Sequence, residues 1–116
     1  MDVDNTLTNP SSELNYAEIE PNDLTIDRLR QYRSDGFEIV LFTSRNMQTY
    51  EGNVGKINAN TLPILIEWLR KHDIPYDEIW TGKPWCGKDG FYVDDKAIRP
   101  DEFVQLSYDE IRKIVG

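Results

Sequence analysis

Residues 36–43 read Gly-Phe-Glu-Ile-Val-Leu-Phe-Thr, a short run of mostly apolar residues that starts after a glycine and ends at a polar residue. The run from Phe37 to Phe42 contains β-branched residues and has few polar breaks, which predicts a strand that is buried on both faces. Strands of this kind belong to parallel sheets with helices packed on them. This stretch therefore decides the expected fold class, an α/β protein.

The segment before this strand predicts a helix. Asp23 or Thr25 is the candidate N-cap, and Gly36 lies just past the expected end. The polar stretch 9–22, rich in Pro, Ser and Glu, predicts a loop. The apolar residues that recur at nearly helical spacing are Leu24, Ile26, Leu29 and Tyr32.

The segments after the strand alternate in the same way. Residues 44–57 are polar with two glycines and predict a long loop. Residues 61–72 have a helical period, and residues 78–81 and 90–93 predict two further short strands.

A last helix is predicted from Ser107, which forms a capping box with Glu110, through Ile114. This order of strands and helices predicts an α/β domain with a mainly parallel sheet, and a chain of 116 residues fits a single domain, residues 1–116. In such sheets ligands bind beyond the carboxyl ends of the strands.

Composition limits the expected partners and compartment. The chain has 13 Lys and Arg against 21 Asp and Glu, a net charge of −8, which would repel nucleic acid and anionic membrane surfaces. The single cysteine, Cys86, excludes an internal disulfide, and no apolar run is long enough to span a bilayer. The N-terminus has no secretory signal, so we expect a soluble, cytoplasmic protein.

Two pairs of carboxylates are the candidate metal ligands. Asp2 and Asp4 are two residues apart, so on an extended backbone their side chains point the same way. Asp94 and Asp95 follow residues 90–93 directly. An oxygen-only cluster of this kind suits Mg²⁺, whereas zinc would require Cys or His ligands. The expected metal ligands are Asp2, Asp4, Asp94 and Asp95.

Two other polar residues follow predicted strands. Thr43 can donate a hydroxyl and Lys83 can place a positive charge near phosphate oxygens, and Lys88 is the alternative to Lys83. Phosphoryl transfer depends mainly on positioning and charge stabilisation, and a carboxylate can act as its nucleophile.

These residues fall in the order of four known motifs. Asp2-Val3-Asp4-Asn5-Thr6 resembles the DxDx[TV] motif of the haloacid dehalogenase-like (HAD) superfamily. Thr43 in LFTSR resembles its second motif, Lys83 in GKPW its third, and Asp94-Asp95 in FYVDD its fourth. Residues 43–58 and 82–100 are similar to short phosphatases of capsule or polysaccharide biosynthesis.

The resemblance implies a Rossmann-like three-layer α/β/α fold with a mainly parallel sheet. The gaps at residues 7–23 and 46–60 are too short for a large cap domain. The site should therefore be open, which suits a bulky substrate or a homo-oligomer that completes the pocket.

The resemblance also implies a role for each residue. Asp2 attacks phosphorus, and Asp4 protonates the leaving oxygen and then activates water, while its carbonyl helps to hold Mg²⁺. Asp95 is the expected direct metal ligand, with Asp94 in support. Lys83 neutralises charge and Thr43 binds the transferring group. The candidate substrate contacts are Arg45 and Asn46, followed by Tyr50, Glu51 and Asn53.

The expected function is that of a Mg²⁺-dependent phosphatase acting on a small phosphomonoester through an aspartyl-phosphate. By resemblance, the substrate is a sugar phosphate or a related metabolite of surface polysaccharide assembly. Two alternatives stay open: a phosphatase for nucleotide or nucleic-acid ends, and a catalytically impaired module that binds a phosphorylated ligand.

The N-terminus departs from the family pattern. The family has a buried strand leading into the first aspartate, whereas only Met1 precedes Asp2 here. We expect that the first strand is truncated or replaced by another segment. Its loss would leave the neighbouring strands with unpaired backbone, and Asp2 would lie at a fraying terminus.

Overall fold

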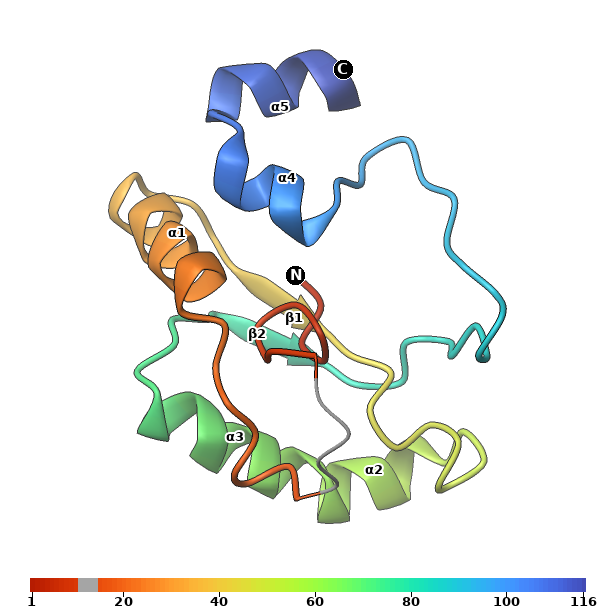
Figure 1. The fold of residues 1–116 in the computed structure, drawn as a ribbon. Helices are drawn as coiled ribbons and strands as arrows, with labels where there is room; N and C mark the ends of the chain where they lie inside the picture. Colours follow the sequence, from red (N-terminus) through yellow and green to blue (C-terminus); the bar gives the residue numbers. More distant parts are fainter. Residues whose placement is uncertain (11–14) are drawn as a thin grey trace. The chain divides into compact units, whose positions relative to one another are not determined.

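The computed structural model describes residues 1–10 and 15–116, which form two compact units, Met1–Trp85 and Cys86–Gly116 (Figure 1). Residues 11–14 of the predicted loop 9–22 lie outside the described residues. The elements of the first unit are α1 (Asp23–Ser34), β1 (Val40–Phe42), α2 (Val54–Asn60), α3 (Leu62–Lys71) and β2 (Glu78–Trp80). The second unit contains α4 (Pro100–Gln105) and α5 (Tyr108–Val115). Whether the two units form a single domain stays a prediction.

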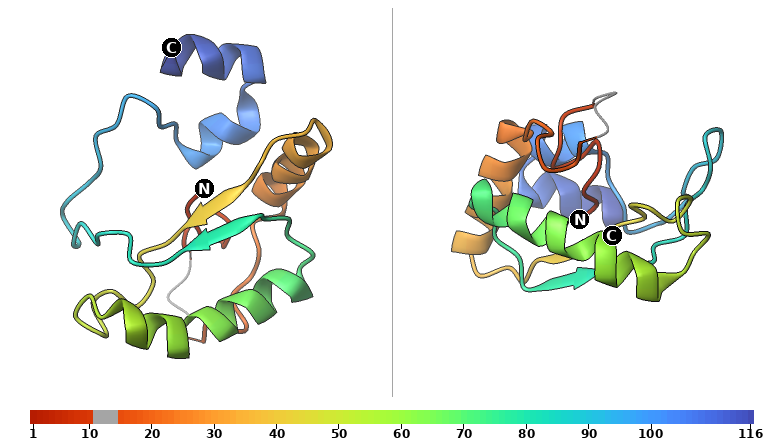
Figure 2. Two further views of the ribbon diagram at one scale, coloured as in Figure 1. Left: turned by 180° about the vertical axis from the view of Figure 1, so that it is seen from behind. Right: turned by 90° about the horizontal axis from the view of Figure 1, so that it is seen from below.

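The first unit is an α/β structure, as predicted. Strands β1 and β2 run parallel and side by side, with Leu41 opposite Ile79 and Phe42 opposite Trp80 (Figure 2). No large cap is present among the described residues, and in that part of the chain no helix is long and apolar enough to cross a membrane.

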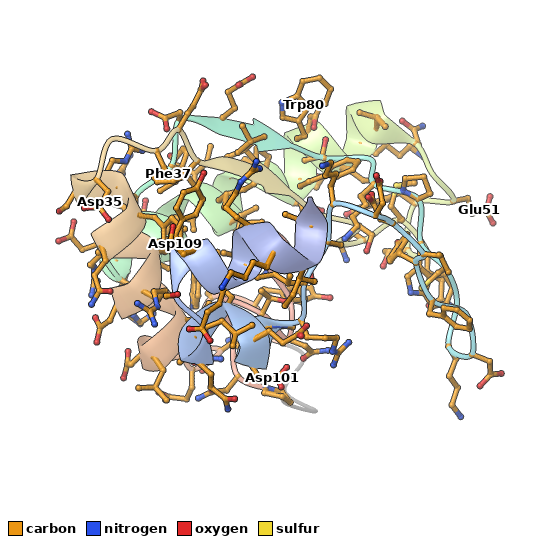
Figure 3. All side chains as sticks on the ribbon, turned by 90° about the horizontal axis from the view of Figure 1, so that it is seen from above. Asp35, Phe37, Glu51, Trp80, Asp101 and Asp109 are labelled. Carbon is orange, nitrogen blue, oxygen red and sulfur yellow. The ribbon has the colours of Figure 1, made fainter. Side chains whose placement is uncertain are left out.

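Strand β1 is shorter and more open than predicted. Ile39 and Leu41 are buried, whereas Phe37 and Phe42 are each more than a third exposed, so burial on both faces was a wrong prediction. Trp80 of β2 also projects outward (Figure 3). The two strands alternate in burial along their length, with Leu41 buried beside exposed Phe42, which apolar content alone does not reveal.

The start of the sheet is held by Asp77. The Ile39 amide donates to Asp77 Oδ2 at 2.7 Å, and Arg33 Nη1 lies 2.9 Å from Asp77 Oδ1. In return the Asp77 amide donates to the Ile39 carbonyl at 2.8 Å. The hydrogen bond from Ile39, followed by the contact with Arg33, lowers the pKa of Asp77 below its ordinary value.

The N-cap of helix α1 precedes both candidates, by one residue for Asp23 and by three for Thr25. Asn22, rather than Asp23 or Thr25, is the N-cap, and its Oδ1 accepts from the Thr25 amide at 3.3 Å. Thr25 is already the third residue of the helix, and its amide is the group that Asn22 caps, so Thr25 is not the N-cap. Beyond the helix, Gly36 takes a left-handed conformation with φ +95°, as a terminating glycine does.

Helix α2 was not predicted, because it begins inside the stretch 44–57 that was expected to be a loop. Asn53 caps it, with its Oδ1 accepting from the Lys56 amide at 3.1 Å. Only Ile57 is buried, so the helix has no apolar stripe that a periodicity argument could detect.

Helix α3 matches its prediction and supplies much of the core. Its residues Leu65, Trp68 and Leu69 are buried. Other fully or almost fully buried apolar residues of the first unit are Val3, Leu7, Ile26, Leu41 and Ile57. Val3 lies within the first predicted motif and Leu7 follows it directly, so the motif is fixed to the core at both positions.

In the second unit, the last helix was predicted correctly and the strand was not. Ser107 and Glu110 form the expected capping box of α5. Residues 90–93 are not a strand: Phe91 is 79% and Val93 is 89% exposed. A strand requires paired backbone, and within the second unit no other strand is present among the described residues.

Asp77→Asn should lower the melting temperature at neutral pH by a few degrees, because the carboxylate that binds Ile39 and Arg33 is lost. The folded pKa of Asp77 lies below its unfolded pKa, so its contribution is complete above about pH 4 and disappears as the pH falls through the folded pKa. The difference in melting temperature between wild type and variant should therefore narrow in acid.

Thermal unfolding followed by circular dichroism across the acid range measures this difference. Asp27→Asn is the matched control, because Asp27 belongs to an exposed ion pair with Arg30 on α1. A difference that stays constant into strong acid would contradict the assignment.

Candidate active site

Met1 joins the sheet beside β1. Its amino group donates to the Val40 carbonyl and its carbonyl accepts from the Phe42 amide, both at 2.9 Å. This alternation is the pattern of a parallel ladder. The β1 edge at this point is therefore paired by a single residue, and Asp2 leaves it at the carboxyl end of β1.

Asp4 lies in a tight turn. The buried Val3 carbonyl accepts from three successive amides, starting with Thr6, at 2.8–3.2 Å. Asn5 takes a left-handed conformation with φ 61°, which Asn tolerates better than most residues, and its amide donates to Thr8 Oγ at 2.9 Å. The turn therefore fixes where the Asp4 side chain leaves the backbone.

Thr43 and Lys83 extend the ladder beyond β1 and β2. The Thr43 amide donates to the Trp80 carbonyl at 2.9 Å, and the Lys83 amide donates to the Thr43 carbonyl at 3.1 Å. Lys83 Nζ then lies 3.7 Å from Asp2 Oδ1, while Thr6 Oγ donates to Asp2 Oδ2 at 3.1 Å. The structure thus brings Asp2, Thr43 and Lys83 together at one sheet edge.

The hydroxyl of Thr43 faces the protein. Its Oγ accepts from the Arg45 amide at 3.1 Å, and the residue is 1% exposed. Contact between this hydroxyl and a transferring phosphoryl group stays a prediction. It requires the residues that cover Thr43 to move away from it.

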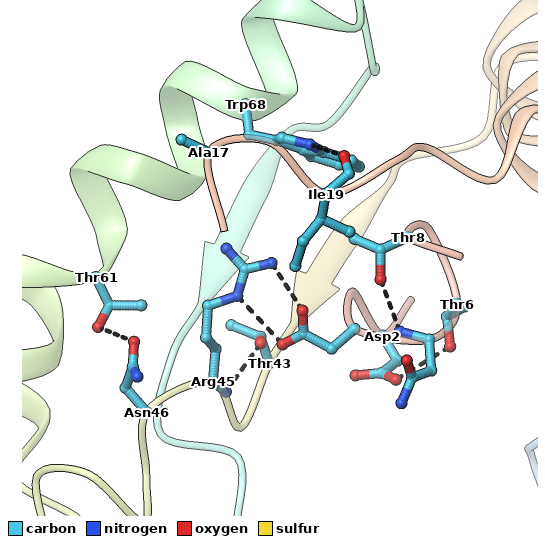
Figure 4. Close-up of polar contacts among 12 residues, drawn as sticks. Asp2, Thr6, Thr8, Ala17, Ile19, Thr43, Arg45, Asn46, Thr61 and Trp68 are labelled. Carbon is cyan, nitrogen blue, oxygen red and sulfur yellow. Dashed lines mark hydrogen bonds and ion pairs between the residues drawn. The ribbon is translucent and has the colours of Figure 1, made fainter. Parts of the chain in front are cut away.

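Arg45 is turned toward Asp4. Its Nε and Nη2 donate to Asp4 Oδ2 and Oδ1 at 3.2 and 2.8 Å, which are the dashed lines at the Arg45 guanidinium in Figure 4. Its Cζ lies 4.2 Å from the centre of the Tyr16 ring. The side chain is 1% exposed, against 32% for Asp4. A direct contact between Arg45 and a substrate stays a prediction, and it would require the guanidinium to leave Asp4.

Tyr16 was not found from the sequence. Burial, followed by the charge of Asp4, raises its pKa above the ordinary value, while Arg45 acts in the opposite direction. The only local signal is an aromatic residue in a polar, loop-like stretch, which indicates packing but not the partner.

The side chain of Asn46 is hydrogen-bonded within the protein. Its Oδ1 accepts from Thr61 Oγ at 2.6 Å and its Nδ2 donates to Thr49 Oγ at 3.1 Å, with a left-handed φ of 61°. These contacts give it a structural role, and its proposed substrate contact stays untested. Glu51 is exposed on the same loop (Figure 3), and Asn53 caps α2.

Asp94 and Asp95 belong to the second unit. Asp94 Oδ1 accepts from the Lys96 amide at 2.8 Å, and both aspartates are exposed. Their approach to Asp2 and Asp4 therefore stays a prediction. Lys88 also lies in the second unit, whereas the contact with Asp2 favours Lys83 as the phosphate-binding lysine.

The candidate metal ligands of the first unit are of the chemical type that magnesium prefers. Among the described residues no group of three or more Asp, Glu, His or Cys is close enough to hold a metal ion. Asp2, which is 36% exposed, and Asp4 offer only oxygen donors. Mg²⁺ takes one or two carboxylates and keeps several waters, so these two residues suit part of such a site.

No family model matches the chain, and no curated protein matches it. A crystal structure of a structural-genomics target from Vibrio cholerae is similar to it, with 55% sequence identity and a TM-score of 0.95. The match covers 98% of this chain and 92% of the Vibrio cholerae chain.

Asn46→Ala should destabilise the first unit by about 1–3 kcal/mol, because it removes two hydrogen bonds and leaves a non-glycine residue without side-chain support at positive φ. Thr61→Val is the partial control: it removes only the bond to Asn46 and should cost about 1 kcal/mol. Urea unfolding followed by tryptophan fluorescence measures both. Wild-type stability in Asn46→Ala would show that these contacts carry no weight.

Proposed function

We propose that the chain, which belongs to the same family as the Vibrio cholerae protein, is a Mg²⁺-dependent phosphatase that forms an aspartyl-phosphate on Asp2. The observation that carries the proposal is the 3.7 Å contact between Asp2 and Lys83 at the sheet edge, where Thr43 directly follows β1. The same three residues stand in the order of the HAD motifs. Asp4, two residues from Asp2, supplies the second carboxylate.

Asp2 has the surroundings of a nucleophile. Thr6 holds Oδ2, and the Lys83 ammonium lies near Oδ1 while the carboxylate remains a third exposed. In the first step an Asp2 oxygen bonds to phosphorus as the bond from phosphorus to the ester oxygen breaks. Protonated Asp4 gives its proton to that leaving oxygen, and Lys83 offsets the negative charge of the phosphoryl group.

The second step regenerates the carboxylate. Asp4, now ionised, takes a proton from a water molecule as the water oxygen attacks phosphorus. The bond between phosphorus and Asp2 breaks, so inorganic phosphate leaves and Asp4 carries the proton again. The 32% exposure of Asp4 leaves this carboxylate accessible to water on the side away from Arg45.

In the first unit, Asp2 and the Asp4 carbonyl would hold magnesium. By the resemblance of the motifs alone, Asp95 would be a further ligand, with Asp94 in support. When bound, the ion supplies the positive charge that a phosphate dianion and an aspartate need in order to approach each other. A chain of net charge −8 has to provide that charge locally.

The full proposal includes a three-layer HAD-like fold and a small substrate. The parallel pair β1–β2 and the pairing of Met1 beside β1 support such a sheet. The absence of a large cap among the described residues suits an open site. The substrate class, a sugar phosphate or related small metabolite, rests on the resemblance of the motifs.

Asp2→Asn should lower phosphatase activity by a factor of about 10³ or more, because the amide cannot attack phosphorus. Release of inorganic phosphate from a panel of sugar phosphates, with Mg²⁺ present, measures it. Asp27→Asn on the exposed face of α1 is the matched control and should keep wild-type activity. Full activity in Asp2→Asn would exclude the mechanism.

Chelation should abolish activity, and added Mg²⁺ should restore it. Asp95→Asn should raise the Mg²⁺ concentration needed for half-maximal activity by about tenfold or more. Asp89→Asn, an exposed aspartate of the same unit, is the control and should leave the Mg²⁺ requirement unchanged. Full activity after complete removal of divalent cations would contradict the proposal.

A further inference from the structure

We propose that Arg45 and Tyr16 are positioning residues that fix the carboxylate of Asp4, so that the loop carrying Tyr16 controls the acid/base group. The inference rests on the proposed function of Asp4 and adds two residues to it. Neither residue needs to touch the substrate in this role.

The first step of the argument is the fork between Arg45 and Asp4. Two hydrogen bonds of 3.2 and 2.8 Å join the guanidinium to both carboxylate oxygens, which fixes the plane as well as the position of the carboxylate. Arg45 is 1% exposed and Asp4 is 32% exposed, so the fork lies on the protein side of Asp4. The exposed side of Asp4 stays available for a leaving group or water.

The second step is the face of the guanidinium. The Tyr16 ring covers it at 4.2 Å from Cζ, a distance typical of a cation–π contact. Arg45 Nη1 is also buried and has no hydrogen-bond partner among the described residues. The guanidinium is therefore held by Asp4 and by Tyr16, and removal of the ring would admit water to a buried cation.

The third step is the support of Tyr16. Its loop is anchored just after it, where Trp68 Nε1 donates to the Ile19 carbonyl at 2.8 Å and both side chains are buried (Figure 4). A bridge between Thr8 and Pro21 closes the ends of the loop. The hydrogen bond from Trp68 of α3 to the loop therefore helps to hold the Tyr16 ring against Arg45.

The geometry also distinguishes the two oxygens of Asp4. Both accept hydrogen bonds from Arg45, yet a proton carried to the leaving group must sit on one of them. The contact of Oδ2 with Nε, at 3.2 Å, is the longer, whereas Oδ1 lies 2.8 Å from Nη2. Oδ1 is therefore the more closely held of the two oxygens.

The test compares two phosphomonoesters in wild type and variants. An alkyl phosphate has a poor leaving group and needs the proton from Asp4, whereas p-nitrophenyl phosphate has a good one and needs it much less. Arg45→Met should lower kcat for the alkyl ester by about 10²-fold and for the nitrophenyl ester by less than about tenfold, with little change in KM.

Matched variants separate the contributions of the Arg45 charge, the two hydrogen bonds to Asp4 and the Tyr16 ring. Arg45→Lys keeps the charge but not the fork and should remain impaired on the alkyl ester, and it is the second variant if Arg45→Met does not fold. Tyr16→Leu should lower kcat for the alkyl ester by about tenfold, and Tyr16→Phe, which keeps the ring, should rescue most of it. Arg30→Met, on the exposed side of α1, is the arginine control.

Three outcomes would overturn the inference. A rise in KM for both esters in Arg45→Met at unchanged kcat would make Arg45 a substrate contact. Equal losses on the two esters would remove the link to proton transfer. Wild-type kinetics in Tyr16→Leu would exclude a role for the loop.

A readout without turnover separates this inference from the proposed function. The Arg45 Nε–H signal in ¹⁵N NMR should exchange slowly with water in wild type and in Tyr16→Phe, and faster in Tyr16→Leu and Asp4→Ala. Slow exchange in a wild-type chain that hydrolyses no phosphomonoester would overturn the function and leave the positioning intact. Equal exchange in all four proteins would overturn the positioning itself.

Discussion

The parallel ladder between β1 and β2 is the constraint on which the rest of the first unit depends. It continues past the named strands, because the Thr43 amide binds the Trp80 carbonyl and the Lys83 amide binds the Thr43 carbonyl. Met1 adds one residue to the other side of β1. Three chain segments therefore end at the same edge, and each delivers a polar side chain there. The register of backbone hydrogen bonds, rather than any contact between side chains, sets the distance between Asp2 and Lys83. A shift of one residue would turn the side chains to the opposite face.

Charge balance explains why this edge is stable in so acidic a chain. Asp2 lies beside Lys83 and Asp4 is hydrogen-bonded to Arg45, so each aspartate of the first motif has a basic partner. The pairs differ in kind. The 3.7 Å contact with Lys83 is loose and partly exposed, whereas the fork with Arg45 is short, bidentate and buried on the arginine side. A loose pair lets an arriving phosphate or cation compete for Asp2, and a buried fork resists such exchange.

The sequence was sufficient to predict residues whose position follows from the end of a strand. It was not sufficient for residues whose position depends on contacts between segments far apart in the chain. Thr43 and Lys83 follow short apolar runs, so a parallel sheet places them together once both runs are strands. Residues 90–93 have equally apolar composition but no strand partner in their own unit, and composition cannot supply one. Tyr16 was not predicted because its contact with Arg45 depends on the fold of its loop. That loop is anchored by a hydrogen bond from Trp68, which is distant in the sequence. Helix α2 was not predicted because the segment that Asn53 caps has a single buried residue, which gives no apolar periodicity.

Exposure is graded across the site in a way that matches the proposed division of roles. Asp2 and Asp4 are each about a third exposed, Lys83 less so, and Thr43 and Arg45 almost not at all. If the phosphatase proposal holds, a phosphate meets Asp2 and Lys83 first, since their atoms are reachable without rearrangement. Arg45 then acts from behind Asp4, where water cannot weaken its hydrogen bonds. Substituting the residues in front should alter attack on phosphorus, whereas substituting those behind should alter the orientation of a group that is still present. That ordering follows from burial alone and does not depend on the identity of the substrate.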